Sequence, residues 1–248
     1  MTIHIVLPAY DEAENLPALL TALAQTLAGL SAPGRVWLVD DGSRDGTADV
    51  ARRFAPALAI TVEVHGQNLG LGRTLADGLA RALAAAADDD AIVTMDADDT
   101  HPPAVIPNLL AALDAGADVA VASRYVAGAR LHGVPLRRRL LSHAAAQLVR
   151  LATPVAGVRD VTCGFRAYRV AALRRAAARY DHLVEADGFA CMLDLLLKLD
   201  AVGATITEVP IDLRYDRKRG ASKLRVGRTV METVGVMTRH RKGVTSDR

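Results

Sequence analysis

The feature that most constrains the fold of this chain is an alternation of short apolar runs with longer helical patterns over residues 3–125. The apolar runs are brief and rich in β-branched residues, which is typical of buried strands. Leucines between them recur at helical spacing, as at Leu16, Leu20, Leu23 and Leu27. Strands that alternate with helices favour a parallel sheet with helices on both faces. The sequence predicts strands at 3–7, 36–39, 60–64, 91–95 and 119–122, and helices around 16–27, 75–83 and 105–113.

Polar residues cluster directly after each predicted strand. In a parallel sheet, ligands bind beyond the carboxyl ends of the strands, so clusters at those ends predict one shared site. Scattered surface turns would not coincide with strand ends so regularly. The clusters are residues 8–12, 40–43, 68–72, 96–99 and 123–125.

The cluster after the fourth strand carries three carboxylates, those of Asp96, Asp98 and Asp99. Packed acids repel one another, and their burial is costly unless a positive charge offsets it. Asp96-Ala97-Asp98 places two hard oxygen ligands on one side of an extended segment, and diphosphate oxygens would complete a Mg²⁺ or Mn²⁺ site. Such a metal would neutralise a nucleoside diphosphate as it leaves. The alternative is a solvated acidic turn.

Two further clusters allow more than one interpretation. Asp45 and Thr47 suit a helix cap, whereas Asp41 suits hydrogen bonds from a base or a ribose. The glycine turn at 68–72 leads into a helix and suits a phosphate. Neither a Gly-x-Gly-x-x-Gly motif nor a Walker-type Gly-Lys-Ser/Thr occurs, which disfavours a dehydrogenase and a P-loop enzyme.

Composition narrows the class of protein. A chain of 248 residues with 51% hydrophobic residues can bury a sizeable core, and a net charge of +2 gives no argument for a nucleic-acid partner. Cys163 and Cys191 match neither a disulfide framework nor a metal-site spacing, which fits a reduced, cytoplasmic setting. We expect no signal peptide and no membrane-spanning run.

The second half of the chain is less regular. We expect a helix led by the basic residues 137–139, an extended segment at 162–169, an apolar helix at 189–199 and an extended segment at 209–215. A helix over 224–240 would have Val226, Val230, Val234 and Met237 on its apolar face. It would either pack on the domain or lie on an anionic membrane surface. We expect one catalytic domain over 1–222, followed by this amphipathic helix and a polar tail over 223–248.

In this order, the clusters resemble the family 2 glycosyltransferases of the GT-A fold, a mostly parallel α/β sheet flanked by helices. Further motifs resemble the dolichol-phosphate (polyprenol-phosphate) mannosyltransferase branch of that family. The family motifs are Leu7-Pro8-Ala9-Tyr10-Asp11-Glu12, Asp40-Asp41-Gly42-Ser43, Asn68-x-Gly-x-Gly72, Asp96-Ala97-Asp98 with His101-Pro102-Pro103, and Ser123-Arg124-Tyr125. The branch motifs are Arg138-Arg139-Leu140-Leu141-Ser142, Cys163-Gly164-Phe165-Arg166, Glu208-Val209-Pro210 and residues 217–223.

The resemblance implies a metal-dependent, inverting transfer of a hexose, in the first instance mannose from GDP-mannose, to a polyprenyl or dolichyl monophosphate. That acceptor is already ionised near neutral pH, so it needs cations rather than a general base. Arginine suits this task because its planar fork binds two phosphate oxygens. By the resemblance, the nucleotide sugar is bound by Pro8, Tyr10, Glu12, Asp41, Asp96, Ala97 and Asp98, the metal by Asp96 and Asp98, and the catalytic set is Asp98, Arg124, Arg138, Ser142, Arg217 and Lys223.

Several alternatives accompany this interpretation. For the basic residues 137–139 the alternative is a solvated helix start, and for residues 217–223 it is a mobile basic loop. Thr100 stands where the branch has a Gln that helps to hold the cation, so Asp99 or a water would complete the site. If the acceptor were a hydroxyl group, Glu185 or Asp187 would serve as its base, with Asp194 structural. A catalytically inactive nucleotide-sugar-binding protein is a third interpretation. A lipid acceptor implies a cytoplasmic protein at the periphery of the inner membrane face.

Overall fold

A computed structural model describes residues 1–134, 155, 157–188, 190–220 and 231–239 of the chain. Most elements lie close to their predicted positions. The strands are β1 (Ile3–Ala9), β2 (Gly34–Asp40), β3 (Ile60–Val64), β4 (Ala91–Thr94), β5 (Val119–Ser123), β6 (Arg130–His132), β7 (Arg166–Arg169), β8 (Ile206–Pro210) and β9 (Asp212–Arg214). The helices are α1 (Leu16–Ala28), α2 (Thr47–Arg52), α3 (Leu71–Ala85), the 3-10 turn η1 (Pro103–Val105), α4 (Ile106–Asp114), α6 (Val170–Arg179) and α7 (Ala190–Ala201).

Seven strands form the main sheet, in the order β3-β2-β1-β4-β7-β5-β8. The sheet is mostly parallel, as predicted, but β7 runs antiparallel to both of its neighbours, β4 and β5. The pattern at 162–169 predicted an extended segment without its direction. β7 reads Arg-Ala-Tyr-Arg, and the alternation of side chains along a strand is the same in either direction, so the sequence pattern does not encode the direction of β7.

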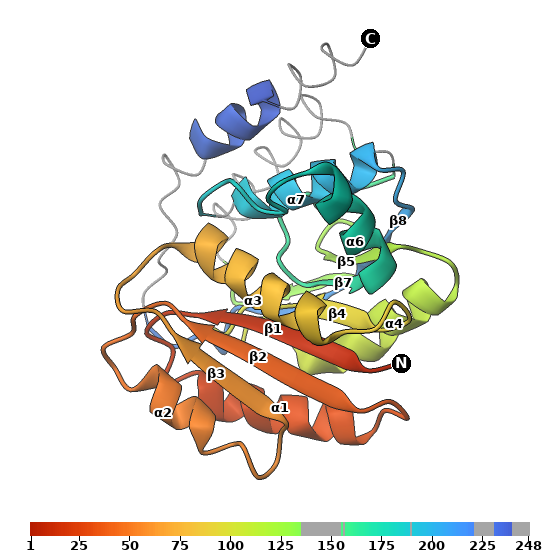
Figure 1. Cartoon of the computed structure of the whole chain (residues 1–248). Helices are drawn as coiled ribbons and strands as arrows, with labels where there is room; N and C mark the ends of the chain where they lie inside the picture. The colour runs from red at the N-terminus through yellow and green to blue at the C-terminus, as the bar shows by residue number, and fades with distance from the viewer. Residues whose placement is uncertain (135–154, 156, 189, 221–230, 240–248) are drawn as a thin grey trace.

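Helices cover both faces of the sheet (Figure 1). The helices α3, α6 and α7 lie on one face, and α1, α2 and α4 lie on the other. The leucines that predicted the first helix form the buried side of α1, since Leu16, Leu19, Leu20 and Leu23 are fully buried. The core therefore lies in two layers, one above and one below the strands.

The carboxyl ends of the parallel strands meet at one edge of the sheet. Ala9 at the end of β1 is in register with Asp40 at the end of β2, and the amide of Asp41 donates to the carbonyl of Ala9 over 2.8 Å. Because β7 is antiparallel, its first residue, Arg166, is in register with Thr94 at the end of β4. The reversed strand thus brings the 163–166 motif to the same edge as the acids at 96–99.

The C-terminal helix packs on the domain through residues that only partly coincide with its predicted apolar face. Residues 231–239 are helical, and this helix lies on the same side of the sheet as α7 (Figure 1). Val236 and Thr233 are buried, whereas Met231 is 72% and Val234 is 52% exposed. Of the predicted apolar face, Met237 is partly buried against the core, whereas Val234 does not pack on the domain. Val226, Val230 and the predicted domain boundary at 222 lie outside the described residues.

Across the described part of the chain, no helix combines the length and the apolar character that crossing a membrane requires.

Candidate active site

The acidic cluster follows β4 and is tightly hydrogen-bonded. The hydroxyl and the amide of Thr100 donate to Oδ1 of Asp98 over 2.6 and 3.2 Å, and Nζ of Lys218 donates to Oδ2 of Asp98 over 2.5 Å. The side chain of Asp98 is 13% exposed and that of Asp96 is 29% exposed, while Ala97 between them is buried. Asp99 has a φ of 58°, in the left-handed region, so the chain turns sharply there.

The charges in this cluster shift the pKa values of their neighbours. Burial raises the pKa of Asp96 above its ordinary value. Burial acts in the same direction on Asp98, but the ammonium of Lys218 outweighs it and holds the pKa of Asp98 below its ordinary range. Burial would lower the pKa of Lys218, and Asp98 raises it instead. The acid pair therefore depends on a nearby cation, which Lys218 supplies in this conformation.

The motif at 163–166 supports Asp96 from the side. The amide of Asp96 donates to Nδ1 of His101 over 3.1 Å, and the His101 ring stacks on Phe165 at 5.2 Å between centroids. A Cβ atom on Gly164 would lie 3.1 Å from Oδ1 of Asp96. Glycine at 164 therefore lets the carboxylate approach the backbone of β7's leading loop closely.

Asp96 and Asp98 fit a divalent cation, because their shared negative charge already attracts a positive group. Among the described residues, no group of three or more His, Cys, Asp or Glu side chains is arranged to hold a metal ion. Further ligands would therefore come from the diphosphate of a substrate and from water. The hydroxyl of Thr100 donates to Asp98, so Thr100 orients that carboxylate. Asp99 is buried, its Oδ1 has no hydrogen-bond partner among the described residues, and burial raises its pKa.

The predicted nucleotide-binding residues lie at the ends of β1 and β2. Pro8 and Tyr10 are half-buried there. Glu12 is buried, and its Oε2 accepts a hydrogen bond from Nδ2 of Asn15 over 2.6 Å. Asp45 accepts from both the amide and the hydroxyl of Thr47, but the N-cap of α2 is Gly46 and has no side-chain cap hydrogen bond, so the prediction that Asp45 or Thr47 is the cap was wrong.

The carboxylate of Asp41 is hydrogen-bonded within the protein. Its carboxylate accepts from the amides of Leu69 and Gly70 over 2.8 and 2.9 Å, and Nδ1 of His65 lies 2.8 Å from Oδ1. The side chain is buried. Asp41 therefore holds the glycine turn at 68–72 in place, a role that the sequence interpretation did not include. Its predicted contact with a base or ribose stays a prediction.

Arg124 is also committed to a partner within the chain. Its Nε and Nη2 atoms each donate to the carboxylate of Asp160 over 2.7 Å, and Nη2 also donates to Thr162. Asp160 is fully buried, and its amide donates to Oε1 of Glu208 over 2.7 Å. Burial would raise the pKa of Asp160, but the Arg124 guanidinium holds it below its ordinary value. Nη1 of Arg124 has no hydrogen-bond partner among the described residues. It is therefore the atom of Arg124 that could bind a phosphate.

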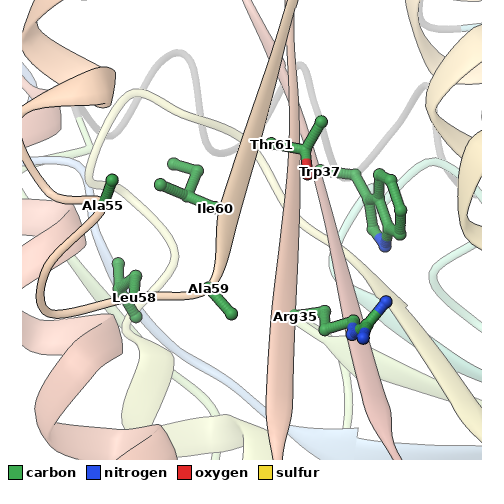
Figure 2. Close-up of a pocket in the computed structure, with 7 residues that line it drawn as sticks. All are labelled: Arg35, Trp37, Ala55, Leu58, Ala59, Ile60 and Thr61. Atoms are coloured by element: carbon green, nitrogen blue, oxygen red, sulfur yellow. The ribbon is translucent and has the colours of Figure 1, made fainter.

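The other predicted cations are less well defined by the structure. Arg217 is exposed, and with Arg214 it lines a cavity of about 440 Å³ between α1, residues 102–104 and β9. Arg138, Ser142 and Lys223 lie outside the described residues. A second cavity, of about 280 Å³, opens at the amino ends of β2 and β3, since its Arg35 is in register with His4 near the start of β1 (Figure 2). That cavity lies away from the strand-end clusters.

Glu185 and Asp187, the two candidate bases for a hydroxyl acceptor, and the structural acid Asp194 differ in their contacts. Asp194 is buried, and it accepts from the amides of Glu185 and Ala186 and from Nζ of Lys198, which supports its structural interpretation. Glu185 lies 3.0 Å from the same ammonium. Asp187 lies beside the glycine turn, since a Cβ atom on Gly70 would be 3.8 Å from its Oδ1.

Sequence reasoning missed Lys218, Asn15 and Asp160 as members of the site. Lys218 lies between two arginines and Asn15 follows Glu14, so the local sequence does not distinguish either residue from its polar neighbours. A buried carboxylate opposite Arg124 could have been expected on physical grounds, since a buried guanidinium requires a partner. No local signal identifies which acid provides it.

The mostly parallel sheet with helices on both faces defines an α/β protein of the GT-A fold. A model of the family described as "Glycosyl transferase family 2" matches residues 4–176, and the chain belongs to this family. It is a glycosyltransferase, as the sequence predicted.

Curated relatives are similar in sequence to this chain over most of its length. A polyprenol monophosphomannose synthase of Mycolicibacterium smegmatis is 35% identical over 89% of this chain and 80% of its own length. An undecaprenyl-phosphate mannosyltransferase of Micrococcus luteus is 34% identical over 96% of this chain and 93% of its own length. A dolichol-phosphate mannosyltransferase of Pyrococcus furiosus is 32% identical over 94% of this chain, which spans 61% of that longer protein.

Solved structures confirm the fold. A glucosyl-3-phosphoglycerate synthase of Mycobacterium tuberculosis, solved with Mn²⁺, uridine diphosphate and glucosyl-3-phosphoglycerate, matches with a TM-score of 0.70. The match covers 96% of this chain and 79% of that chain at 22% identity. The same synthase with Mg²⁺ and uridine diphosphate matches with a TM-score of 0.71. At this identity the match establishes the GT-A fold and nothing of the substrate.

Proposed function

We propose that this glycosyltransferase moves mannose from GDP-mannose to a polyprenyl or dolichyl monophosphate, with inversion and with Mg²⁺ or Mn²⁺ as cofactor. The observation that carries the proposal is the meeting of the acid pair Asp96 and Asp98 with Lys218 at the carboxyl edge of the sheet. A site that alternates negative and positive groups suits two anionic substrates. The names of the relatives, which all specify a polyprenol-type phosphate and mannose, support the choice of substrates.

The proposed reaction needs no proton to be removed. An oxygen of the lipid phosphate forms a bond to the anomeric carbon, while the bond from that carbon to the diphosphate breaks and its electron pair leaves with the nucleoside diphosphate. The metal, when bound, supplies positive charge to the departing diphosphate. The protein's own task is to hold two anions in line and to exclude water.

We assign the residues by their positions. Pro8, Tyr10 and Glu12 would contact the base and ribose, and Asp41 would act mainly by shaping the glycine turn beside them. Asp96 and Asp98 would hold the metal, with the backbone of Ala97 alongside the diphosphate. Arg124 would offer one amine to a phosphate. Arg138, Ser142, Arg217 and Lys223 keep their predicted phosphate contacts.

We further propose a peripheral position on the cytoplasmic face of a membrane, where a lipid phosphate is found. The helix at 231–239 supports this proposal, because Met231 and Val234 expose apolar surface on it while Arg239 adds positive charge. Such a face suits the boundary between head groups and acyl chains. In this proposal residues 1–222 form the catalytic domain and residues 223–248 its membrane-facing appendage.

A donor-by-acceptor screen tests the proposed function. The purified chain is given GDP-mannose, UDP-glucose or UDP-N-acetylglucosamine with Mn²⁺ or Mg²⁺, each with and without a polyprenyl phosphate. We expect an organic-soluble, acid-labile mannolipid only when GDP-mannose, metal and lipid phosphate are all present. A lipid product from another donor would correct the sugar, and metal-dependent donor use without a lipid product would overturn the acceptor. Sugar transfer that requires an added acceptor would also exclude an inactive binding protein.

The second candidate keeps the donor and changes the acceptor to a hydroxyl group, and the place of Asp187 beside the glycine turn favours it. A hydroxyl acceptor needs a base that contributes about 10²- to 10⁴-fold to the rate. With a lipid phosphate acceptor, we therefore expect Glu185→Gln and Asp187→Asn each to stay within about threefold of the wild-type turnover. Steady-state rates of mannolipid formation measure this. A fall of a hundredfold or more in either variant, with the fold intact by circular dichroism, would contradict a transfer that needs no base.

A further inference from the structure

The segment Arg217 to Arg219, here called the basic strap, contacts the acidic cluster and is anchored at two of its residues, Lys218 and Arg219. It begins three residues after the end of β9, whose last residue, Arg214, donates its amide to the carbonyl of Thr100 over 2.9 Å. One anchor is the ion pair of Lys218 with Asp98. The other is formed by Asn15, at the start of α1.

Asn15 recognises the backbone of the strap rather than a side chain. Its Oδ1 accepts from the amide of Arg219 over 2.9 Å, and its Nδ2 donates to the carbonyl of Arg219 over 3.2 Å. The second Nδ2 hydrogen is directed at Glu12 over 2.6 Å. Asn15 is only 3% exposed, and all of its amide groups are used. The strap is thus tied to the same glutamate that is proposed to contact the nucleotide.

Lys218 places its charge inside the acid cluster. Its side chain is 13% exposed, so the ammonium has lost most of its water. Asp98 is its main partner, and the negative charges of Glu12 and Asp96 add to the attraction. A buried ammonium is stable only with such partners. Arg217 and Arg219, on either side, are exposed.

Both carboxylate oxygens of Asp98 already accept hydrogen bonds in the structure. Oδ1 is taken by Thr100, and Oδ2 is taken by Lys218, so a divalent ion that binds Asp98 meets the ammonium at that carboxylate. Two positive charges at one carboxylate repel each other, and the repulsion is strong where water is partly excluded. Metal and Lys218 must compete for this position.

We infer that Lys218 is the resident counter-cation of the acid pair, and that a divalent metal binds Asp98 by displacing it. Displacement releases one of the two anchors of the basic strap, while Asn15 keeps the other. Metal binding is thereby coupled to the strap, so the strap reports whether the metal has entered. This inference rests on the metal site of the proposed function and assigns a role to Lys218 that the motif comparison does not contain.

The test measures metal affinity without any turnover. The full-length chain, without nucleotide, is titrated with Mn²⁺, and free Mn²⁺ is followed by electron paramagnetic resonance. Lys218→Met should bind Mn²⁺ at least about fivefold more tightly than the wild type, a typical size for a coupling between sites. Arg219→Met is the matched control, because it removes one positive charge from the neighbouring, exposed position. Its affinity should change less than about twofold.

Three results would overturn the inference. Equal or weaker Mn²⁺ binding by Lys218→Met would show that the lysine does not compete, and equal tightening by Arg219→Met would show a general effect of loop charge. Absence of Mn²⁺ binding in all three proteins, even with GDP added, would remove the metal site itself. The last result also contradicts the metal dependence of the proposed function, whereas the first two leave it intact.

Hydrogen exchange of the strap gives a second readout. In the wild type, saturating Mg²⁺ should speed exchange in a peptide that covers residues 214–220 by at least about threefold, as expected when an anchoring contact is lost. In Lys218→Met the anchor is already absent, so Mg²⁺ should have little effect. Unchanged exchange in the wild type at a Mg²⁺ concentration that saturates the site would contradict the coupling between metal and strap.

Discussion

Asp98→Asn should lower the rate of mannosyl transfer about a thousandfold, the scale expected when a group that stabilises developing charge is removed. The substitution keeps the shape of the side chain, and its amide oxygen can still accept from Thr100. It removes the negative charge that attracts both Lys218 and a metal. The measurement is kcat/KM for GDP-mannose with a polyprenyl phosphate as acceptor, followed through the lipid product.

Asp49→Asn is the control for this variant. Asp49 lies on α2, is 72% exposed and pairs with Arg52, so its loss changes the same charge without touching the site. We expect its rate to stay within about twofold of the wild type. If Asp98→Asn kept its fold and lost less than tenfold in kcat/KM, Asp98 would have no place beside the reacting diphosphate.

Asp160→Ala should lower the free energy of unfolding by about 1.5–3 kcal/mol, because it removes the charged acceptor of Arg124, whose side chain is 23% exposed. Asp160 is fully buried, and its carboxylate accepts two hydrogen bonds from the fork of Arg124. Urea unfolding followed by circular dichroism measures the loss. Replacing both members, with Asp160→Leu and Arg124→Met, should recover part of it, since no uncompensated charge then remains.

A surface ion pair provides the comparison. Glu63 pairs with Arg81, and their side chains are 32% and 62% exposed. Glu63→Ala should therefore cost about 1 kcal/mol or less. Equal losses for Asp160→Ala and Glu63→Ala would contradict the importance that we assign to the buried pair.

The stabilisation by Asp160 should also depend on pH in a defined direction. Arg124 holds the pKa of Asp160 below its ordinary value, so the folded state favours the ionised form. The stabilisation is then fully present above the unfolded pKa of about 3.9, and it is lost as the pH falls through the lower folded pKa. The difference between the wild type and Asp160→Ala should be constant near neutral pH and shrink only in acid.

Much of the first half of the fold follows from local patterns. Residues 60–64 were predicted as a strand and form β3, and the leucines of α1 are buried as their spacing indicated. Such predictions succeed because periodicity reports which face of an element is buried. The direction of β7 and the packed edge of the helix at 231–239 did not follow. Both depend on where distant parts of the chain arrive, and residue periodicity contains no such information.

The candidate site divides in the same way. The strand-end rule placed Asp96 and Asp98 at the end of β4, because parallel strands share a carboxyl edge. The same rule does not predict that Arg124 and Asp41 form most of their hydrogen bonds within the protein. A side chain's type sets what it can bind, whereas its neighbours in space decide what it does bind.

The class of this protein can be predicted from its residues alone: an alternating α/β chain of glycosyltransferase family 2, with its acids and cations at strand ends. These properties are local in the chain or repeat along it. The folded chain adds three contacts that no local pattern predicts: Lys218 pairs with Asp98, Asn15 binds the backbone of Arg219, and Gly164 before β7 lies against Asp96. Each of those contacts joins residues far apart in the sequence, so the free energy that selects them exists only once the chain has folded.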